Sequence, residues 1–466
     1  MERSLSFEPY LLTPLDHIIK DFYVSSFISF PLHDPTTAVS ALKDGVERLT
    51  RALPFLSGAR VPSSKLPGKR NVMEIHPSPE SLEWIPMLQI KHYRDTTLVA
   101  TCSPGPTGCS DLDDSWCALP IIIPADRPSP VARFRASVFP DGILLCMTLN
   151  HAVFDGSGLG TVLKMLATCC CANSAMDHPV SLPTTYAKEA SSRQIILESA
   201  APSSGSDSEA YDRIFKSNDI IPGLDKGITS RRFSFPASKI RALKDACNAA
   251  KPTDQDPAIS RNDVLTALLT ICMTRARQTE QTKNLTTQLA VPVNLRRKFH
   301  PSLPDSYLGN TIIPLVVDID PPTVPSSRCG TSPMHAHLNE LTNLSLRIRK
   351  ELKLLDEKDY TGGLVSYLRE QSDWGATSMK FTDITVSSLR HLDINGLDFG
   401  PEIGRANSFD VQSGMYPGIC DIMPTCGRDR VEDINDVPWD VCVTLEDSAW
   451  SAFMEDDLVL WALEKI

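Results

Sequence analysis

The sequence contains no run of about 18–20 uninterrupted apolar residues, the length that a membrane-spanning helix requires. It also has no excess of positive charge, because 57 Asp and Glu outnumber 46 Lys and Arg and leave a net charge of −11. A general nucleic-acid-binding protein needs a basic face. We therefore expect neither a membrane nor a nucleic-acid partner, although a local basic patch still allows an anionic ligand.

Paired cysteine motifs are also missing. The 13 cysteines include no C-x-x-C pair, and three of them are consecutive at 169–171. This usage predicts reduced thiols rather than a disulfide framework or a zinc site. His335 and His337 have no third ligand at metal-site spacing, so we expect surface histidines and no metal. The N-terminal stretch has no basic segment followed by an apolar one, so we expect no signal peptide and a cytoplasmic location.

What the sequence does contain is an alternation of strand and helix patterns. Residues 21–31 and 132–149 are rich in β-branched and aromatic residues and predict strands, the second segment forming a hairpin. Apolar residues at three- and four-residue steps predict helices at 38–54 and 260–277. The segment 198–215 is poor in large apolar residues and predicts a linker. The predicted fold class is therefore α/β, with two halves of similar size.

One short motif carries recognisable chemistry. In "TLNHAVFDGSGLG", His151 follows a strand-like apolar run, and Asp155 and three glycines follow it. A histidine at the end of a buried strand can present a neutral imidazole, which is a usable base near pH 7, to a cleft. Asp155 either orients that ring or turns away and pairs with an arginine. The glycine spacing is not that of a phosphate loop, and the motif by itself fits a core histidine and a helix-capping aspartate equally well.

Further segments place this motif in a family context. They read, in chain order, "LTPLDHI", "LKDGVERLTRALPFLSGAR", "NHAVFDGSG", "ISRNDVLTALL", "VNLRRKFHPSLPDSYLGN" and "VSSLRHLDINGLDFGPEIG". Together they resemble the BAHD family of acyl-CoA-dependent O- and N-acyltransferases, especially the fungal branch that includes trichothecene 3-O-acetyltransferase. Two positions depart from the plant pattern: residues 398–404 read DFGPEIG instead of DFGWG, and Leu389 stands where many members have tryptophan.

The resemblance implies a fold and a domain division. It implies the two-domain chloramphenicol-acetyltransferase-like fold, with mixed sheets, flanking helices and a channel between the domains. The N-terminal domain, 1–197, would carry the HxxxD motif, and the C-terminal domain, 216–466, would carry the DFG motif, with 198–215 as the linker. The acyl-CoA would enter this channel from one face and the acceptor from the other. The resemblance also implies a monomer.

The resemblance further assigns roles to single residues. His151 would be the general base, and Asp155 would pair with Arg296, which lies in the "VNLRRKF" segment. The loop residues Asp398, Phe399 and Gly400 would be structural. Ser387 and Ser388 would contact the pantetheine arm of coenzyme A, while the alternative is two exposed serines that close a strand.

Three hypotheses about function follow. The first is an acyl-CoA-dependent O-acyltransferase, most simply an acetyltransferase that uses acetyl-CoA as co-substrate, holds no permanently bound cofactor, and acts on a hydroxyl group (or an amine) of a fungal secondary metabolite. The second is transfer from a carrier protein on the same fold, against which Asn150 before His151 and the DFG motif count. The third is a non-catalytic binding protein, against which the intact His151, Asp155 and Asp398 count.

Overall fold

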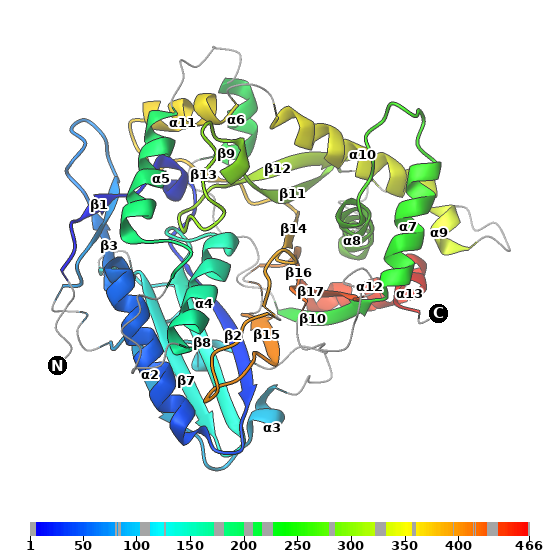
Figure 1. Ribbon diagram of the computed structural model, residues 1–466. Coiled ribbons are helices and arrows are strands. Elements are labelled where there is room, and N and C mark those ends of the chain that lie inside the picture. The colour runs from blue at the N-terminus through cyan, green and yellow to red at the C-terminus, as the bar shows by residue number, and fades with distance from the viewer. Residues whose placement is uncertain are drawn as a thin grey trace.

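The structure is a computed structural model of the 466-residue chain. It describes residues 6–79, 82, 85–102, 112–124, 127–171, 181–199, 208–216, 227–278, 285–321, 332–356, 360–394, 396–412, 414, 416–425 and 437–464. Two sheets, each covered by helices on one face, dominate these residues (Figure 1). The prediction of an α/β fold is confirmed.

The N-terminal sheet has five strands. In sheet order they are β15 (Ser408–Val411), β2 (Tyr23–Pro31), β8 (Gly142–Asn150), β7 (Ala132–Phe139) and β5 (Leu88–His92). Every residue of β7 and β8 is buried, as expected for the apolar run at the centre of this sheet. Helices α2 (Pro35–Ala52) and α4 (Gly156–Cys171) pack together on one face (Figure 1). The strand β8 thus runs through the core and ends directly before the HxxxD motif.

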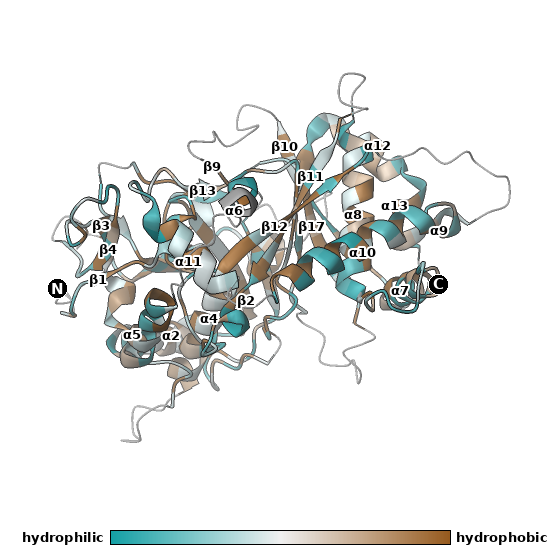
Figure 2. Cartoon of the chain, turned by 90° about the horizontal axis from the view of Figure 1, so that it is seen from above, coloured by the Kyte–Doolittle hydropathy of each residue, from teal (hydrophilic) through white to brown (hydrophobic). Residues whose placement is uncertain are grey.

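The C-terminal sheet has six strands. In sheet order they are β10 (Ile228–Phe235), β17 (Trp439–Glu446), β16 (Ile419–Ile422), β14 (Ile384–Ser388), β11 (Thr287–Asn294) and β12 (Ile312–Ile319). The helices on its covered face are α7 (Ala237–Ala249), α8 (Arg261–Arg277), α10 (Leu338–Leu354), α12 (Trp450–Glu455) and α13 (Asp457–Leu463). The strands are mostly brown in Figure 2, whereas α7 and α10 carry teal faces, as expected for strands buried beneath amphipathic helices.

Shorter elements complete the described chain. The small sheets consist of β1 (Tyr10–Leu11), β4 (Met73–His76), β3 (Ala59–Pro62) and β6 (Ser129–Pro130), and of β9 (Phe215–Lys216) and β13 (Ser378–Met379). The remaining helices are α1 (Pro14–His17), α3 (Leu98–Cys102), α5 (Tyr186–Glu198), α6 (Ser208–Ile214), α9 (Pro333–Ala336) and α11 (Tyr360–Glu370). Single 3-10 turns lie at Pro54–Ser57, Asp114–Trp116, Arg296–Lys298 and Asp447–Ala449.

The two cores exchange segments of the chain. Strand β15 pairs with β2, so a segment from the last quarter of the chain extends the N-terminal sheet (Figure 1). Phe399 and Phe409 belong to the N-terminal core, whereas Leu15 and Ile196 belong to the C-terminal core. Of the predicted linker, residues 200–207 lie outside the described residues and 208–214 form α6. The two halves are therefore held together by strand pairing and core packing, in addition to the segment of chain that joins them.

Two details of the helices bear on the sequence predictions. Helix α8 begins with the capping box that Ser260 and Asp263 predict. In contrast, the prediction that His337 is a surface histidine is wrong: it is 2% exposed and lies near Arg275, Glu340 and Asp457. It is buried because it separates α9 from α10, where α9 packs on α13 and α10 packs on α8. Within the described stretches, no helix is both long and apolar enough to cross a membrane.

Candidate active site

Two hydrogen bonds to the main chain of His151, one from each half of the chain, hold the HxxxD turn in place. The His151 N–H donates to the Phe22 carbonyl at 2.8 Å, next to β2 in the N-terminal sheet. Its carbonyl accepts from Asn310 Nδ2 at 3.0 Å, close to β12 of the C-terminal sheet. The Asn310 side chain also donates to Asp16 Oδ1 at 3.3 Å. The backbone of His151 is therefore fixed at the junction of the two halves.

The imidazole of His151 has one buried edge and one accessible edge. It is partly exposed, its Nδ1 is buried without a hydrogen-bond partner among the described residues, and the ring lies edge-on to Phe22 at 5.0 Å. The accessible part of the ring is therefore the edge that carries Nε2. Burial lowers the pKa of His151, against a smaller opposing effect of the Asp155 charge. The ring is thus neutral, and able to accept a proton, at physiological pH.

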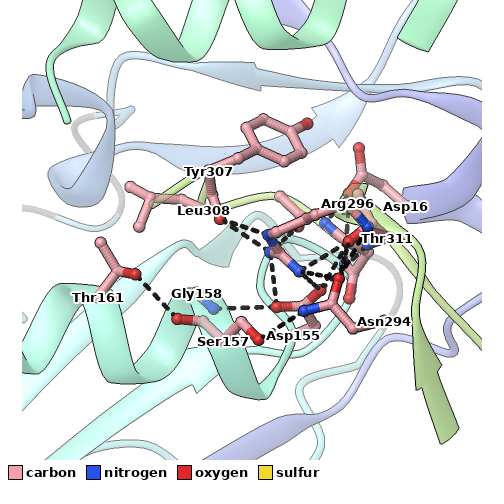
Figure 3. Close-up of polar contacts among 12 residues, drawn as sticks. Asp16, Asp155, Ser157, Gly158, Thr161, Asn294, Arg296, Tyr307, Leu308 and Thr311 are labelled. Carbon is pink, nitrogen blue, oxygen red and sulfur yellow. Dashed lines mark hydrogen bonds and ion pairs between the residues drawn. The ribbon is translucent and has the colours of Figure 1, made fainter. Parts of the chain in front are cut away.

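Asp155 turns away from this ring and forms a buried ion pair with Arg296 (Figure 3). The two guanidinium nitrogens Nη1 and Nη2 donate to the two carboxylate oxygens at 2.7 and 2.8 Å, and the side chains are 1% and 0% exposed. The Asp155 carboxylate also accepts from the N–H groups of Gly158 at 2.9 Å and Thr311 at 3.1 Å. No hydrogen bond between Asp155 and the His151 ring occurs in the described part of the chain.

Arg296 uses its remaining donors to hold the segment before β12. It donates to the carbonyls of Tyr307 at 2.8 Å and Gly309 at 2.9 Å, and to Thr311 Oγ1 at 2.7 Å. Every charge in this pair is therefore compensated without water, which is the condition under which a buried ion pair is tolerated. The pair joins the N-terminus of α4 to the C-terminal half.

The glycines of the motif serve close packing. A Cβ on Gly158 would lie 2.2 Å from the Leu308 carbonyl oxygen, so only glycine allows the first turn of α4 to approach this backbone. A Cβ on Gly156 would lie 3.1 Å from Leu389 Cδ2, and one on Gly160 would lie 2.5 Å from Leu392 Cδ2, so these two contacts are with movable side chains. The N-terminus of α4 is thus pressed against the C-terminal half.

Ser387 and Ser388 lie where β14 ends, partly exposed, next to the same helix terminus. His391 Nδ1 lies 3.2 Å from the Ser388 carbonyl, and its Nε2 lies 3.1 Å from Ser157 Oγ. Asn294 Nδ2 donates to the same hydroxyl at 3.0 Å. The structure therefore connects Ser388 to Ser157, in the first turn of α4, through a short chain of polar side chains.

The DFG residues lie elsewhere, at the other end of α4. Asp398 accepts from Cys171 Sγ through its carbonyl at 3.0 Å and from the Gly400 N–H through Oδ1 at 2.9 Å. Phe399 is fully buried and lies edge-on to Phe30 at 4.9 Å. Since α4 has 16 residues, this loop is about 24 Å of helix away from the His151 turn.

We predict that Gly400→Ala destabilises the protein more than Gly404→Ala. Both glycines have positive φ, 92° and 79°, so each alanine is strained by about 1–2 kcal/mol. Only at Gly400 would the new Cβ also lie 3.1 Å from Cys171 Cα, whereas nothing lies within 4 Å at Gly404. Urea unfolding of both variants measures the difference, and equal losses would mean that the loop does not pack tightly on α4.

Sequence reasoning missed several residues of this site. Asn294, Asn310 and Thr311 lie within or beside the "VNLRRKF…YLGN" segment, but nothing local in the sequence assigns them partners. Asp16, in the "LTPLD" segment, accepts from the N–H groups of Thr13 at 2.7 Å and Asn310 at 3.0 Å. The available signal in the sequence was that the motifs containing these residues occur in the same order as in the family that the chain resembles. No group of three or more His, Cys, Asp or Glu side chains that could hold a metal occurs among the residues described.

Comparison with known proteins identifies relatives over the whole chain. The model of the Transferase family matches residues 122–458, and that of the trichothecene 3-O-acetyltransferase-like N-terminal domain matches residues 22–170. Fumigaclavine B O-acetyltransferase of Aspergillus fumigatus is 34% identical over 100% of this chain and 99% of its own. Fumigaclavine B O-acetyltransferase of Penicillium roqueforti is 31% identical over 99% of each chain.

Solved structures share the fold. TRI101 of F. graminearum, in complex with coenzyme A and deoxynivalenol, superposes with a TM-score of 0.75 at 17% identity over 97% of this chain and 98% of its own. Vinorine synthase gives 0.64 at 16% identity over 97% and 93%. The fold and the full-length relatives define an O-acyltransferase. The chain belongs to the Transferase family, and the predicted family, fold and enzyme class are confirmed.

Proposed function

We propose that this enzyme transfers the acetyl group of acetyl-CoA to a hydroxyl group of a small fungal secondary metabolite, with His151 as the general base. The observation that carries the proposal is the His151 ring, which is neutral, partly exposed on its Nε2 edge and fixed between the two halves. The full-length relatives named as O-acetyltransferases support acetyl as the acyl group and oxygen as the acceptor atom.

The arrangement of the C-terminal sheet supports a passage to His151 along the face that is directed toward the N-terminal half. On this face Asn294 of β11 bonds to Ser157 of α4, and Arg232 of β10 donates to the Phe409 carbonyl of β15 at 3.4 Å. Between these two contacts, Thr385 and Ser387 of β14 remain partly exposed. The halves therefore touch at β11 and at β10, and the partly exposed side chains of β14 between these contacts support a passage there.

The reaction follows from this geometry in two steps. The acceptor hydroxyl gives its proton to His151 Nε2 as its oxygen attacks the thioester carbonyl, forming a tetrahedral oxyanion. The oxyanion collapses and breaks the carbon–sulfur bond, and the departing thiolate takes the proton back from His151. The base contributes about 10²–10⁴ in rate. Holding both reactants in the passage contributes much of the rest.

The remaining residues have supporting roles in this proposal. Asp155 and Arg296 fix the turn, and Asp398, Phe399 and Gly400 fix the far end of α4. Ser387 and Ser388 would line the pantetheine arm of the donor. We also propose a monomer, because one chain supplies every residue of the site. The proposed domains are 1–197 and 216–466, with β15 packing on the N-terminal sheet and Leu15 in the C-terminal core. Ten cysteines of the described residues are free thiols, and this supports a cytoplasmic location.

Incubation with acetyl-CoA and a panel of polycyclic alcohols tests the proposal. Release of the coenzyme A thiol and an acetylated product, both dependent on the alcohol, would support it. Activity only with an acetyl-loaded carrier protein would favour transfer from a carrier protein. Binding of coenzyme A by calorimetry without turnover on any alcohol would favour a binding protein.

We predict that the acid limb of kcat has its midpoint below pH 6.5. Burial lowers the pKa of His151, so the ring stays unprotonated, and active as a base, to lower pH than a free histidine. Activity is therefore lost only as the pH falls through that lowered value. Acetyl transfer to a neutral alcohol, measured between pH 5 and pH 8, checks this. A midpoint above pH 7 would contradict His151 as the base.

A further inference from the structure

The carboxylate of Asp421 occupies an unusual place in the C-terminal sheet. It lies in β16 between Cys420 and Ile422, which are both fully buried beneath the helices. Because side chains alternate along a strand, Asp421 points to the opposite face of the sheet. That face looks toward the N-terminal half, not toward bulk solvent.

Neighbours in the same row establish this orientation. Asp421 is paired with Ser387 on β14 and with Cys442 on β17, and Cys442 is paired with Arg232 on β10. Cys442 packs in the N-terminal core, and Arg232 donates to the Phe409 carbonyl of the N-terminal sheet. Asp421 therefore lies on the inner face, beside the partly exposed Ser387.

No described residue forms a hydrogen bond or ion pair with the Asp421 carboxylate. Arg232, two strands away in the same row, pairs instead with Asp410 at 3.8 Å and Asp440 at 3.7 Å. Burial raises the pKa of Asp421 to about 6, although the side chain remains partly exposed. An enclosed carboxylate without a donor is costly, and proteins rarely keep one without a use.

Asp421 is also close to the catalytic turn. The carbonyl of the next residue, Ile422, accepts from the Leu389 N–H at 2.8 Å. The Leu389 side chain contacts Gly156, since a Cβ built there would lie 3.1 Å from Leu389 Cδ2. One backbone hydrogen bond and one leucine side chain thus connect β16 to the turn that carries His151. Asp421 therefore lies on a strand that is joined, through Leu389, to the turn that carries His151.

Aromatic side chains lie farther along the same face. Tyr416 and Phe381 pack edge-on at 5.1 Å, and both are partly exposed. Tyr416 Oη lies 3.5 Å from Thr385 Oγ1, two residues before Ser387 on β14. Burial raises the pKa of Tyr416, and the charge of Asp421 adds to this effect. Carboxylates and aromatic rings together are the groups that bind ammonium ions.

We propose that Asp421 is a specificity-determining residue that binds a protonated amine of the acceptor, so that the preferred substrate is a hydroxylated compound carrying a basic nitrogen. The proposal rests on the proposed function. The ammonium N–H donates to the Asp421 carboxylate, with Tyr416 beside it, while the hydroxyl group reaches His151. Acetyl-CoA does not supply this cation, because its charged groups at neutral pH are phosphates. The Lys20 ammonium lies 4.6 Å from the centre of the Phe381 ring, which leaves Tyr416 as the ring beside the acceptor.

Matched pairs of alcohols test this inference. We would compare tropine, a tertiary amine, with N-acetylnortropine, its uncharged amide, and add two larger pairs built in the same way on polycyclic amino alcohols. Calorimetry measures binding to the wild-type enzyme, to Asp421→Asn and to Asp245→Asn. The Asp245 control removes an exposed carboxylate from α7 and changes the net charge equally. Acetyl transfer from acetyl-CoA is measured in parallel.

The wild-type enzyme should bind the amine of at least one pair about tenfold or more tightly than its amide, as expected for a hydrogen bond to a charged group. Asp421→Asn should abolish this preference without weakening amide binding, and Asp245→Asn should keep it. The melting temperature of Asp421→Asn should be unchanged or higher, since the variant removes an uncompensated carboxylate. Absence of any amine preference in the wild-type enzyme, or its survival in Asp421→Asn, would overturn the inference.

The two proposals fail in different ways. Equal acetylation of both members of every pair would reject the cation site and leave the acetyltransferase function standing. Absence of transfer to every alcohol would reject the function, while an amine preference in binding that depends on Asp421 would still support the cation site.

Discussion

His151→Ala should lower kcat for acetyl transfer by about 10²–10⁴-fold, because the variant removes the proposed general base. The KM for acetyl-CoA should change little. The variant should also fold, since the bonds that hold this turn involve the main chain of His151, and the buried Nδ1 of the ring forms no hydrogen bond with a described residue. Steady-state kinetics, with melting temperature as the folding check, measure this.

His391→Gln is the matched control for this prediction. His391 is the other histidine at this end of α4, and burial lowers its pKa as well, but its nitrogens bond to Ser157 and Ser388. We expect a loss of less than about tenfold, because no general base is removed. Added imidazole should partly restore His151→Ala by filling the vacated space. An equal loss in both variants, or full activity of His151→Ala, would mean that a group other than His151 is the general base.

The sequence predicted those parts of the fold that have a local cause. The buried strand β8 follows from its apolar run, and α8 follows from its capping residues and apolar stripe. The strand β15 has no such signal, because it has four residues and extends a sheet whose other strands lie more than 250 residues earlier. Pairings between distant segments are set by packing, which short-range patterns do not record.

Residues of the candidate site likewise differ in whether the local sequence predicted them. The HxxxD pattern alone indicated His151 and Asp155, but it left open whether Asp155 orients the ring. Only the family resemblance suggested Arg296, which lies 141 residues farther along the chain. Asp421 could not be recognised, because an acidic residue in "ICDI" reads as the solvent-facing position of a strand. Its importance appears only when the opposite half is seen to cover that face.

Arg296→Met should lower the free energy of unfolding by about 3–5 kcal/mol, because it leaves the fully buried Asp155 carboxylate without its cation. The variant also removes the donors of the Tyr307 and Gly309 carbonyls. Arg297→Met is the matched control at the next position. Its guanidinium is 79% exposed and pairs with an exposed Asp305, so the expected loss is below about 1 kcal/mol. Urea unfolding at pH 7 measures both.

The double variant Asp155→Asn/Arg296→Met separates the charge from the packing. If an uncompensated charge causes the loss, the double variant should be less destabilised than the sum of the two single variants, with a coupling of about 0.5–3 kcal/mol. Additive losses would mean that the two side chains act independently. The pair would then not be the link that holds the N-terminus of α4 against the C-terminal half, and the position of His151 between the halves would need another cause, such as the bond from Asn310 to its carbonyl.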